Sequence, residues 1–137
     1  KAVKYPGRPE GIGNAIKLTE EKDNQFSELL RGQDRMWDIN ELEKAMQPVF
    51  DFQKKYDVPV YCGEFGVVVL AEPETRKNWL NDFITLMKKH KVSYSYWSYK
   101  NMDFGIVDYT QQYKDNPNYD AQRLDKNTLK ALQNGIL

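Results

Sequence analysis

The stretch from Val58 to Gly66, which reads Val-Pro-Val-Tyr-Cys-Gly-Glu-Phe-Gly, decides how the rest of the chain is interpreted. It predicts a short apolar strand over residues 58–62 that leads to a carboxylate, Glu64, flanked by two glycines. Enzymes built on parallel strands place reacting groups at such strand ends. Gly63 and Gly66 leave the backbone free to approach a ligand closely. Glu64 is therefore the first candidate for a functional residue, and a solvated glutamate at a strand exit is the alternative.

The composition is that of one globular domain. The chain has 137 residues, of which 40% are hydrophobic and 29% charged, so it can bury one core and has no room for two domains. Twenty basic residues balance twenty acidic ones, which argues against a nucleic-acid partner. No apolar run is long enough to cross a membrane, and no signal-peptide pattern is present. The first residue is Lys1, so we expect a mature form or a fragment.

The chain is rich in aromatic residues and poor in cysteine and histidine. Aromatic side chains make up 13% of the chain, and flat rings both pack in cores and stack on sugars. A single cysteine, Cys62, and a single histidine, His90, exclude an internal disulfide and a Cys/His metal cluster. We expect Cys62 to be a small buried residue and His90 to lie at a helix end. No metal or cofactor is predicted.

The first half of the chain predicts one well-defined helix. Residues 1–37 are rich in turn-forming residues, so we expect an extended loop with a short helix between Thr19 and Arg31. A helix begins after Asp38, because Asp38 and Glu41 have the spacing of a capping box. We expect Pro48 to kink this helix and Asp57 to end it. The apolar residues expected on its buried face are Leu42, Ala45, Met46, Val49, Phe52 and Tyr56.

The second half predicts a helix, a strand and a last helix. Pro73 is well placed for the first turn of a helix over residues 74–90, whose buried stripe contains Trp79, Leu80, Phe83, Ile84 and Met87. The next strand, residues 92–99, alternates serines with aromatics, and the sequence leaves open which set faces inward. Asp125 is expected to cap a final helix that buries Leu129 and Leu132 and ends at Gly135.

The segments between these elements are predicted to be loops. We expect a loop over residues 100–109 with a short extended piece at 104–107, and a polar surface tract over residues 111–118. Strands separated by helices favour a parallel sheet, because a parallel return needs a crossover.

Two motifs at the strand ends resemble a known family. Gly63-Glu64-Phe65-Gly66 and Tyr96-Trp97-Ser98-Tyr99-Lys100, joined by one amphipathic helix, resemble the C-terminal end of glycoside hydrolase family 5, the cellulase and mannanase family built on an eight-stranded (β/α) barrel. Residues 101–108 and Tyr5-Pro6-Gly7 resemble further loops of that barrel. The resemblance implies an α/β fold that is a partial TIM barrel, strands 7 and 8 with flanking helices. Residues 1–137 would be the C-terminal portion of the catalytic domain.

The resemblance also implies site roles. Glu64 would be the nucleophile and Trp97 a platform for the sugar, while Tyr99, Lys100 and Asn101 are candidates to hydrogen-bond sugar hydroxyls. The implied activity is retaining hydrolysis of β-glycosidic bonds in cellulose or another β-1,4-glycan, as in an endo-β-1,4-glucanase. The implied location is secreted or periplasmic.

A retaining glycosidase needs a second carboxyl group about 5 Å from the first. The family's acid/base glutamate follows an asparagine on the fourth strand, which would precede Lys1. Asn40-Glu41 belongs to a helix cap, and Glu72 and Glu74 are assigned structural roles. We therefore expect the N-terminal barrel segment, or another chain, as a partner besides the glycan, and little activity from this chain alone.

Two other interpretations stay open. The chain could be a non-catalytic carbohydrate-binding domain that uses Trp97 and nearby tyrosines, with Trp37 and Trp79 as packing residues. It could also be an α/β fragment that completes itself by oligomerising, because two parallel strands alone expose unpaired edges.

Overall fold

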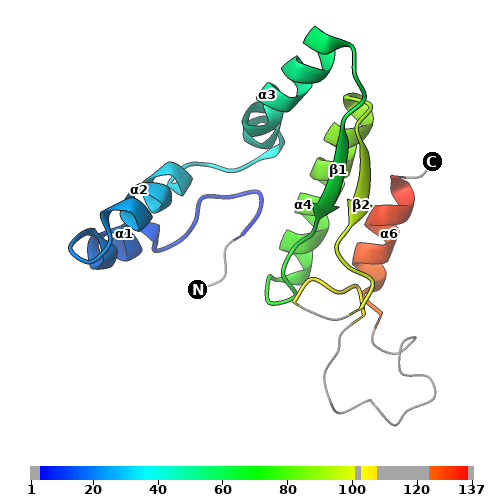
Figure 1. The fold of residues 1–137 in the computed structure, drawn as a ribbon. Coiled ribbons are helices and arrows are strands. Elements are labelled where there is room, and N and C mark those ends of the chain that lie inside the picture. The colour runs from blue at the N-terminus through cyan, green and yellow to red at the C-terminus, as the bar shows by residue number, and fades with distance from the viewer. Residues whose placement is uncertain (1–3, 101–102, 108–123, 136–137) are drawn as a thin grey trace.

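The computed structural model describes residues 4–100, 103–107 and 124–135. Its elements, in chain order, are α1 (Ile12–Glu20), α2 (Asn24–Gln33), α3 (Ile39–Tyr56), β1 (Tyr61–Phe65), α4 (Pro73–Lys89), β2 (Ser93–Tyr96) and α6 (Lys126–Asn134) (Figure 1). In the described part of the chain, no helix combines the length and apolar character that crossing a membrane requires. Asn101 and the polar tract 111–118 lie outside the described residues.

The two strands form a parallel pair, as the sequence predicts. Tyr61 pairs with Ser93, Cys62 with Tyr94 and Phe65 with Tyr96, and α4 makes the crossover between them (Figure 1). The predicted bounds are wrong by a few residues: β1 begins at Tyr61 rather than at residue 58, and β2 covers only part of 92–99. Proline has no N–H to give to a ladder, so the Val58-Pro59 segment precedes the strand.

Burial settles the two faces of the strands. Tyr94 and Tyr96 are half-buried against the core, whereas Ser93 and Ser95 are exposed. The tyrosines therefore face the helices, and the serines face the open side of the sheet.

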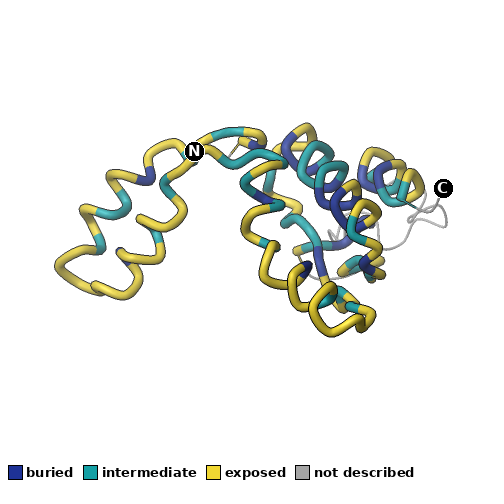
Figure 2. Tube along the Cα trace, turned by 90° about the horizontal axis from the view of Figure 1, so that it is seen from above, coloured by how far each residue is buried: buried dark blue, intermediate teal, exposed yellow. Residues whose placement is uncertain are grey.

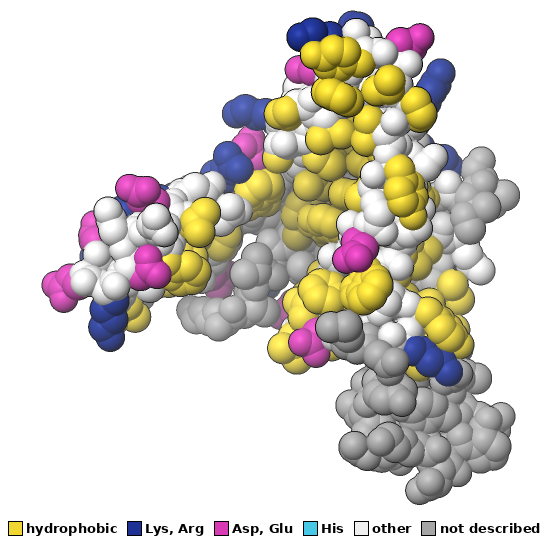
Figure 3. Space-filling model, viewed as in Figure 1, with side chains coloured by type: hydrophobic (Ala, Val, Ile, Leu, Met, Phe, Trp, Pro, Cys, Tyr) yellow, Lys and Arg dark blue, Asp and Glu magenta, His cyan; other side chains and the backbone are white. Residues whose placement is uncertain are grey.

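Helix α3 has the predicted ends but not the predicted burial. Asp38 Oδ1 accepts a hydrogen bond from the Glu41 backbone N–H at 2.9 Å, and Asp57, with φ 51°, ends the helix in the left-handed region. Pro48 lies inside the helix without ending it. Only Leu42 and Phe50 are buried, and part of the expected inner face, namely Ala45, Val49, Phe52 and Tyr56, is exposed. Hydrophobic side chains consequently gather over α3 and β1 on the surface (Figure 3).

The core lies between α4 and the sheet. Pro73 occupies the first turn of α4, and the predicted stripe faces inward, with Leu80 fully buried. The Phe65 ring stacks on Phe83 at 4.5 Å and meets Tyr94 edge-on at 5.3 Å. Figure 2 shows the buried residues concentrated on α4. Burying this aromatic stripe stabilises the strand that carries Glu64.

Helix α6 packs against α4 on the side away from α3 (Figure 1). Asp125 caps it as predicted, by accepting hydrogen bonds from the Asn127 and Thr128 backbone N–H groups at 3.0 Å. The residues it buries are Thr128 and Ala131, whereas Leu129 and Leu132 are only half-buried. The apolar spacing thus identified the helix, but the buried face is turned to one side of the two leucines.

The expectation of an extended loop over residues 1–37 is wrong. Helices α1 and α2 form an antiparallel pair that projects from the core (Figure 1), and the predicted short helix corresponds to α2 alone. Their exposed character is visible in Figure 2. The chain enters and leaves this pair at one point, where Gly7 and Trp37 exchange two backbone hydrogen bonds of 2.9 and 2.8 Å. Residues 8–36 are therefore a closed excursion from the core.

Candidate active site

Glu64 lies at an irregularity in β1. Between the pairs Cys62–Tyr94 and Phe65–Tyr96, β1 contains two residues and β2 only one, Ser95. Such a bulge bends a strand and turns side chains away from strict alternation. Glu64 is exposed, while the next residue, Phe65, is buried in the core. The bulge therefore presents the carboxylate on the open side of the strand end.

The immediate surroundings of Glu64 hold its backbone rather than its carboxylate. The Cys62 thiol donates a hydrogen bond to the Glu64 backbone carbonyl at 3.4 Å, and Cys62 is half-buried rather than buried. On the same open face, the hydroxyls of Tyr61 and Ser95 are hydrogen-bonded across the strands. Within residues 4–100, 103–107 and 124–135, no side chain hydrogen-bonds the Glu64 carboxylate. Such a carboxylate can act as a nucleophile or as a charge that stabilises a cation.

Trp97 follows β2 directly and is tied to the end of β1. Its backbone N–H donates to the Phe65 carbonyl at 2.8 Å, and Trp97 as a whole residue is 41% exposed. The peptide bond between Trp97 and Ser98 is cis. Glu64 directly precedes Phe65, whose carbonyl accepts the hydrogen bond from Trp97. The fold therefore brings the two predicted residues to the same end of the two-stranded sheet.

The remaining predicted residues lie just beyond this edge. Tyr99 is 59% exposed, and Lys100 Nζ lies 5.1 Å from the centre of its ring. Lys100 forms a parallel β-bridge with Val107, which joins the segment after β2 to the later part of the same loop. Asn101 falls outside the described residues, so its predicted role stays a prediction.

The sequence did not reveal how closely the two strand ends approach. A Cβ placed on Gly66 would lie 2.3 Å from the Trp97 carbonyl oxygen. Gly66 therefore allows the backbone of Trp97, rather than a ligand, to come close. At Gly63 a Cβ would meet only the Tyr61 ring, at 3.7 Å, which is an ordinary contact. Of the two glycines, only Gly66 is therefore required by a close approach of the backbone.

An apolar hollow lies next to the end of β1 that carries Glu64. It has a volume of about 410 Å³ and is lined by Tyr5, Trp37, Gly66, Val67, Trp79 and Phe104, among others. The Tyr5 segment is fixed there, because the Tyr5 hydroxyl donates to Asp82 Oδ2 at 2.8 Å and its N–H donates to Thr75 Oγ1 at 3.2 Å. Trp79 stacks on Phe83 at 4.9 Å, which agrees with its predicted packing role.

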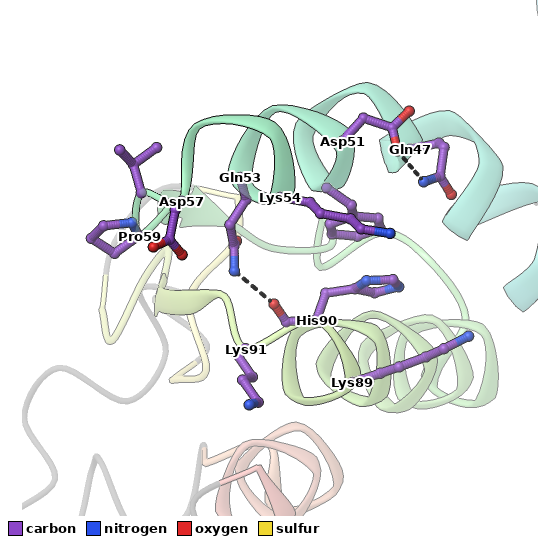
Figure 4. Close-up of a pocket in the computed structure, with 11 residues that line it drawn as sticks. Gln47, Asp51, Gln53, Lys54, Asp57, Pro59, Lys89, His90 and Lys91 are labelled. Carbon is purple, nitrogen blue, oxygen red and sulfur yellow. Dashed lines mark hydrogen bonds between the residues drawn. The ribbon is translucent and has the colours of Figure 1, made fainter.

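A larger hollow, of about 690 Å³, lies at the opposite end of the sheet (Figure 4). Its lining includes Val58 and Pro59 before β1 and His90 and Lys91 before β2, so it is remote from Glu64. His90 ends α4 as predicted. Its ring stacks on Phe50 at 3.6 Å, and its Nε2 is 2.5 Å from Glu43 Oε1. These contacts join α3 to the end of α4, so we assign His90 a structural role.

The other acidic residues near Glu64 in sequence do not form a second site. Glu72 precedes α4, and Glu74 pairs with Lys77 at 3.3 Å within the first turn. Among the residues described, no three His, Cys, Asp or Glu side chains are grouped so that they could hold a metal ion. The described site therefore consists of one carboxylate and one exposed indole on adjacent strand ends.

Known proteins resemble this chain over most of its length. No family model matches. Endoglucanase C of Acetivibrio thermocellus and endoglucanase C307 of Clostridium sp. strain F1 are each 34% identical over 106 residues, which is 77% of this chain. The chain spans about 30% of the length of these curated relatives.

Solved structures give the same picture. Thermotoga maritima Cel5A in complex with mannotriose has a TM-score of 0.56 and 26% identity over 87% of this chain and 36% of its own. A mutant form of Cel5A in complex with cellobiose has a TM-score of 0.55 and 28% identity over 72% of this chain and 29% of its own. The chain is therefore a small α/β segment with the local architecture of these endoglucanases.

Proposed function

We propose that this chain, a cellulase-like fragment of glycoside hydrolase family 5, supplies the nucleophile for retaining hydrolysis of β-glycosidic bonds in cellulose or another β-1,4-glycan. The observation that carries the proposal is the exposed carboxylate of Glu64 at a bulge, beside the strand end that bears Trp97. The names of the relatives support the activity, and the cellobiose and mannotriose bound by Cel5A support a β-linked oligosaccharide as the ligand.

Each predicted residue takes a role in this proposal. Glu64 attacks the anomeric carbon and forms a glycosyl ester while the glycosidic C–O bond breaks and a general acid from outside this chain protonates the leaving oxygen. The same group then deprotonates a water, which hydrolyses the ester and frees Glu64. The exposed indole of Trp97 stacks on the sugar that undergoes cleavage. Tyr99, Lys100 and Asn101 hydrogen-bond hydroxyl groups of the same glycan. Since such a glycan is a polymer, we propose a secreted or periplasmic protein.

The proposal assigns β1 and β2 to strands 7 and 8 of a (β/α)₈ barrel, and residues 1–137 to the C-terminal portion of the catalytic domain. The general acid/base then comes from an N-terminal barrel segment or another chain. Two observations support a partner. Within the described residues β1 pairs with β2 alone, which leaves its other edge unpaired. An apolar hollow of about 300 Å³ lies between α3 and β1, lined by Met46, Val49, Val60 and Tyr61, among others.

Mechanism-based labelling tests the nucleophile. A 2-fluoro-cellobioside with a good leaving group should label Glu64 when the chain is combined with a segment that supplies the acid/base. The Glu64→Gln variant should take up no label, because an amide cannot form the glycosyl ester. Glu72→Gln is the matched control and should label like the wild type. Label on a residue other than Glu64 would refute the proposal.

Exposure of Trp97 and Tyr99 favours one second candidate, a non-catalytic carbohydrate-binding role. In that case the isolated chain binds cello- or manno-oligosaccharides and changes its tryptophan fluorescence on saturation. Absence of such a change, together with labelling of Glu64 in the combined protein, excludes this candidate.

A further inference from the structure

We propose that Arg76 is a positioning residue for the Trp97 platform and acts through Asp125. The inference rests on the proposed function, because it gives Trp97 the role assigned there. Arg76 itself touches neither Glu64 nor the open face of the sheet, so it would escape a search for residues that contact substrate.

Arg76 is a buried cation that joins two helices. It lies on α4 and is only 7% exposed, and its Nη1 is 2.9 Å from Asp125 Oδ2. In the described part of the chain, Nε and Nη2 of this guanidinium have no hydrogen-bond partner. A buried charge is costly unless it is paired, and loss of one partner leaves the other charge uncompensated. The pair therefore fixes the start of α6 against α4.

Asp125 passes this constraint to the loop that follows Trp97. Besides capping α6, its backbone N–H donates to the Ile106 carbonyl at 2.7 Å. The Ile106 N–H in turn donates to the Ser98 carbonyl at 3.0 Å. Ser98 is the residue after Trp97. One chain of contacts thus leads from Arg76 through the α6 cap to the backbone beside the indole.

Tyr96 holds the other side of Ser98. It is the last residue of β2, and its hydroxyl donates to the Phe104 carbonyl at 2.8 Å. Burial raises the pKa of Tyr96, and the neighbouring Arg76 acts against that rise. The Phe104 carbonyl also accepts the Ser98 N–H at 3.4 Å. The route from Arg76 therefore ends at the Ser98 carbonyl, and Tyr96 shares the Phe104 carbonyl with the Ser98 N–H.

The geometry explains why the indole needs such support. The Trp97 N–H holds the residue to β1, but a single hydrogen bond does not fix the direction in which the following loop leaves. A platform must keep its orientation within narrow limits to act on a bound sugar. Removing the guanidinium should leave the strands paired while the Ser98 backbone and the indole move more freely.

Tryptophan fluorescence in the 137-residue chain tests the inference without any sugar. Trp37→Phe and Trp79→Phe leave Trp97 as the only tryptophan of three. In this background Arg76→Met should raise acrylamide quenching of Trp97 about two-fold, because a loosened loop exposes the indole more often. Tyr96→Phe should have a similar effect, and the two effects should be less than additive, because the residues share one network.

Leu86→Ala is the matched control for general destabilisation. Leu86 is also buried on α4, and ten residues along a helix separate it from Arg76 by about 15 Å. This variant should lower Tm but leave quenching of Trp97 unchanged at a temperature where all variants are folded. Unchanged quenching in Arg76→Met, or fully additive effects, would overturn the inference.

Two safeguards keep the test decisive. Should Arg76→Met not fold, Asp125→Asn decides, because it removes the charge that pairs with Arg76 and keeps an oxygen that can accept the α6 cap hydrogen bonds. The readout contains no substrate and does not depend on Glu64. A failure of Glu64 labelling therefore counts against the proposed function only, and a failure of the quenching test counts against the role of Arg76 only.

Discussion

Gly66 brings the two strand ends together at a distance that no larger residue allows. The position where its Cβ would lie is 2.3 Å from the carbonyl oxygen of Trp97, and that oxygen belongs to the backbone. Real Cβ atoms do not approach other atoms so closely, so either Gly66 or Trp97 must shift when a methyl group is added. The Phe104 ring, 3.3 Å away, leaves little room for such a shift.

Gly66→Ala should therefore destabilise the chain by about 1–3 kcal/mol, the usual cost of overpacking. Urea denaturation followed by circular dichroism measures this change. Gly63→Ala is the control: its new methyl group would meet only a ring atom at 3.7 Å, an ordinary contact. Equal unfolding free energies for the two variants would show that the strand ends can separate without cost.

At this scale the sequence predicts residues whose chemistry is local. Glu64 was selected because two glycines flank it; it is exposed, as both the nucleophile and the solvated glutamate require, and its role as nucleophile stays a prediction. Arg76 was not identifiable: a charged residue in a helix normally faces water. Its burial depends on an ion pair with Asp125, which is far away in the sequence. No local sequence pattern predicts this ion pair.

At the scale of elements, Tyr5 ties the segment before α1 to α4. Burial raises its pKa above the ordinary value, as do the hydrogen bond to Asp82 and the negative charges of Asp82 and Asp38. The folded state thus holds the phenolic proton more tightly than the unfolded state does. The resulting stability is fully present below about pH 10 and is lost as the pH rises further.

Tyr5→Phe should lower stability at neutral pH by about 1.5–3 kcal/mol, because it removes a hydrogen bond to a carboxylate. It should also flatten the fall in stability above about pH 10, although Tyr94 and Tyr96, whose pKa values are also raised, keep part of that fall. Unfolding free energies measured on both sides of that pH check the prediction. The exposed Tyr56, changed to Phe, is the control, and an unchanged alkaline slope in Tyr5→Phe would contradict it.

Elements with a cap and a strong apolar stripe were predictable. Asp38, Pro73 and Asp125 mark the starts of α3, α4 and α6 in both sequence and structure. Helix α1 was missed because it has no side-chain cap and begins after Gly11 in a glycine-rich stretch. The apolar face of α3 was predicted to be buried, but periodicity shows only that a face is apolar, and what covers it is decided elsewhere.

At the scale of the whole molecule, the alternation of strands and helices predicted the parallel pairing of β1 and β2. No sequence pattern predicted that residues 8–36 form a helix pair outside the core. Helices α1 and α2 pack extensively against each other and against no other described element to a comparable extent. Leu18 and Leu29 are exposed on them, and Ile12 and Ser27 are their only buried residues. Two short helices with so little burial contribute little to the core.

The excursion should therefore be removable. Gly7 and Trp37 exchange two backbone hydrogen bonds, which is the pairing that closes a two-residue hairpin. Replacing residues 8–36 by the dipeptide Asn-Gly should leave the chain at least as stable as the parent, because shortening the connection from 29 residues to two lowers the entropic cost of closing it by about 2 kcal/mol. The ion pair between Arg35 and Glu41, at 3.0 Å, is lost, but exposed pairs of this kind stabilise little.

Urea denaturation of the deletion variant measures this, and a variant with a Gly-Ser loop of the original length separates the loss of the helices from the shorter connection. If the excursion is independent of the core, the Gly-Ser variant unfolds like the parent chain and the deletion variant is no less stable. A lower free energy of unfolding in the deletion variant alone would mean that the Asn-Gly turn distorts the Gly7–Trp37 pairing. Collapse of both would mean that α1 and α2 support the hollow lined by Tyr5 and Trp79, so that the excursion is part of the structure that holds the candidate site.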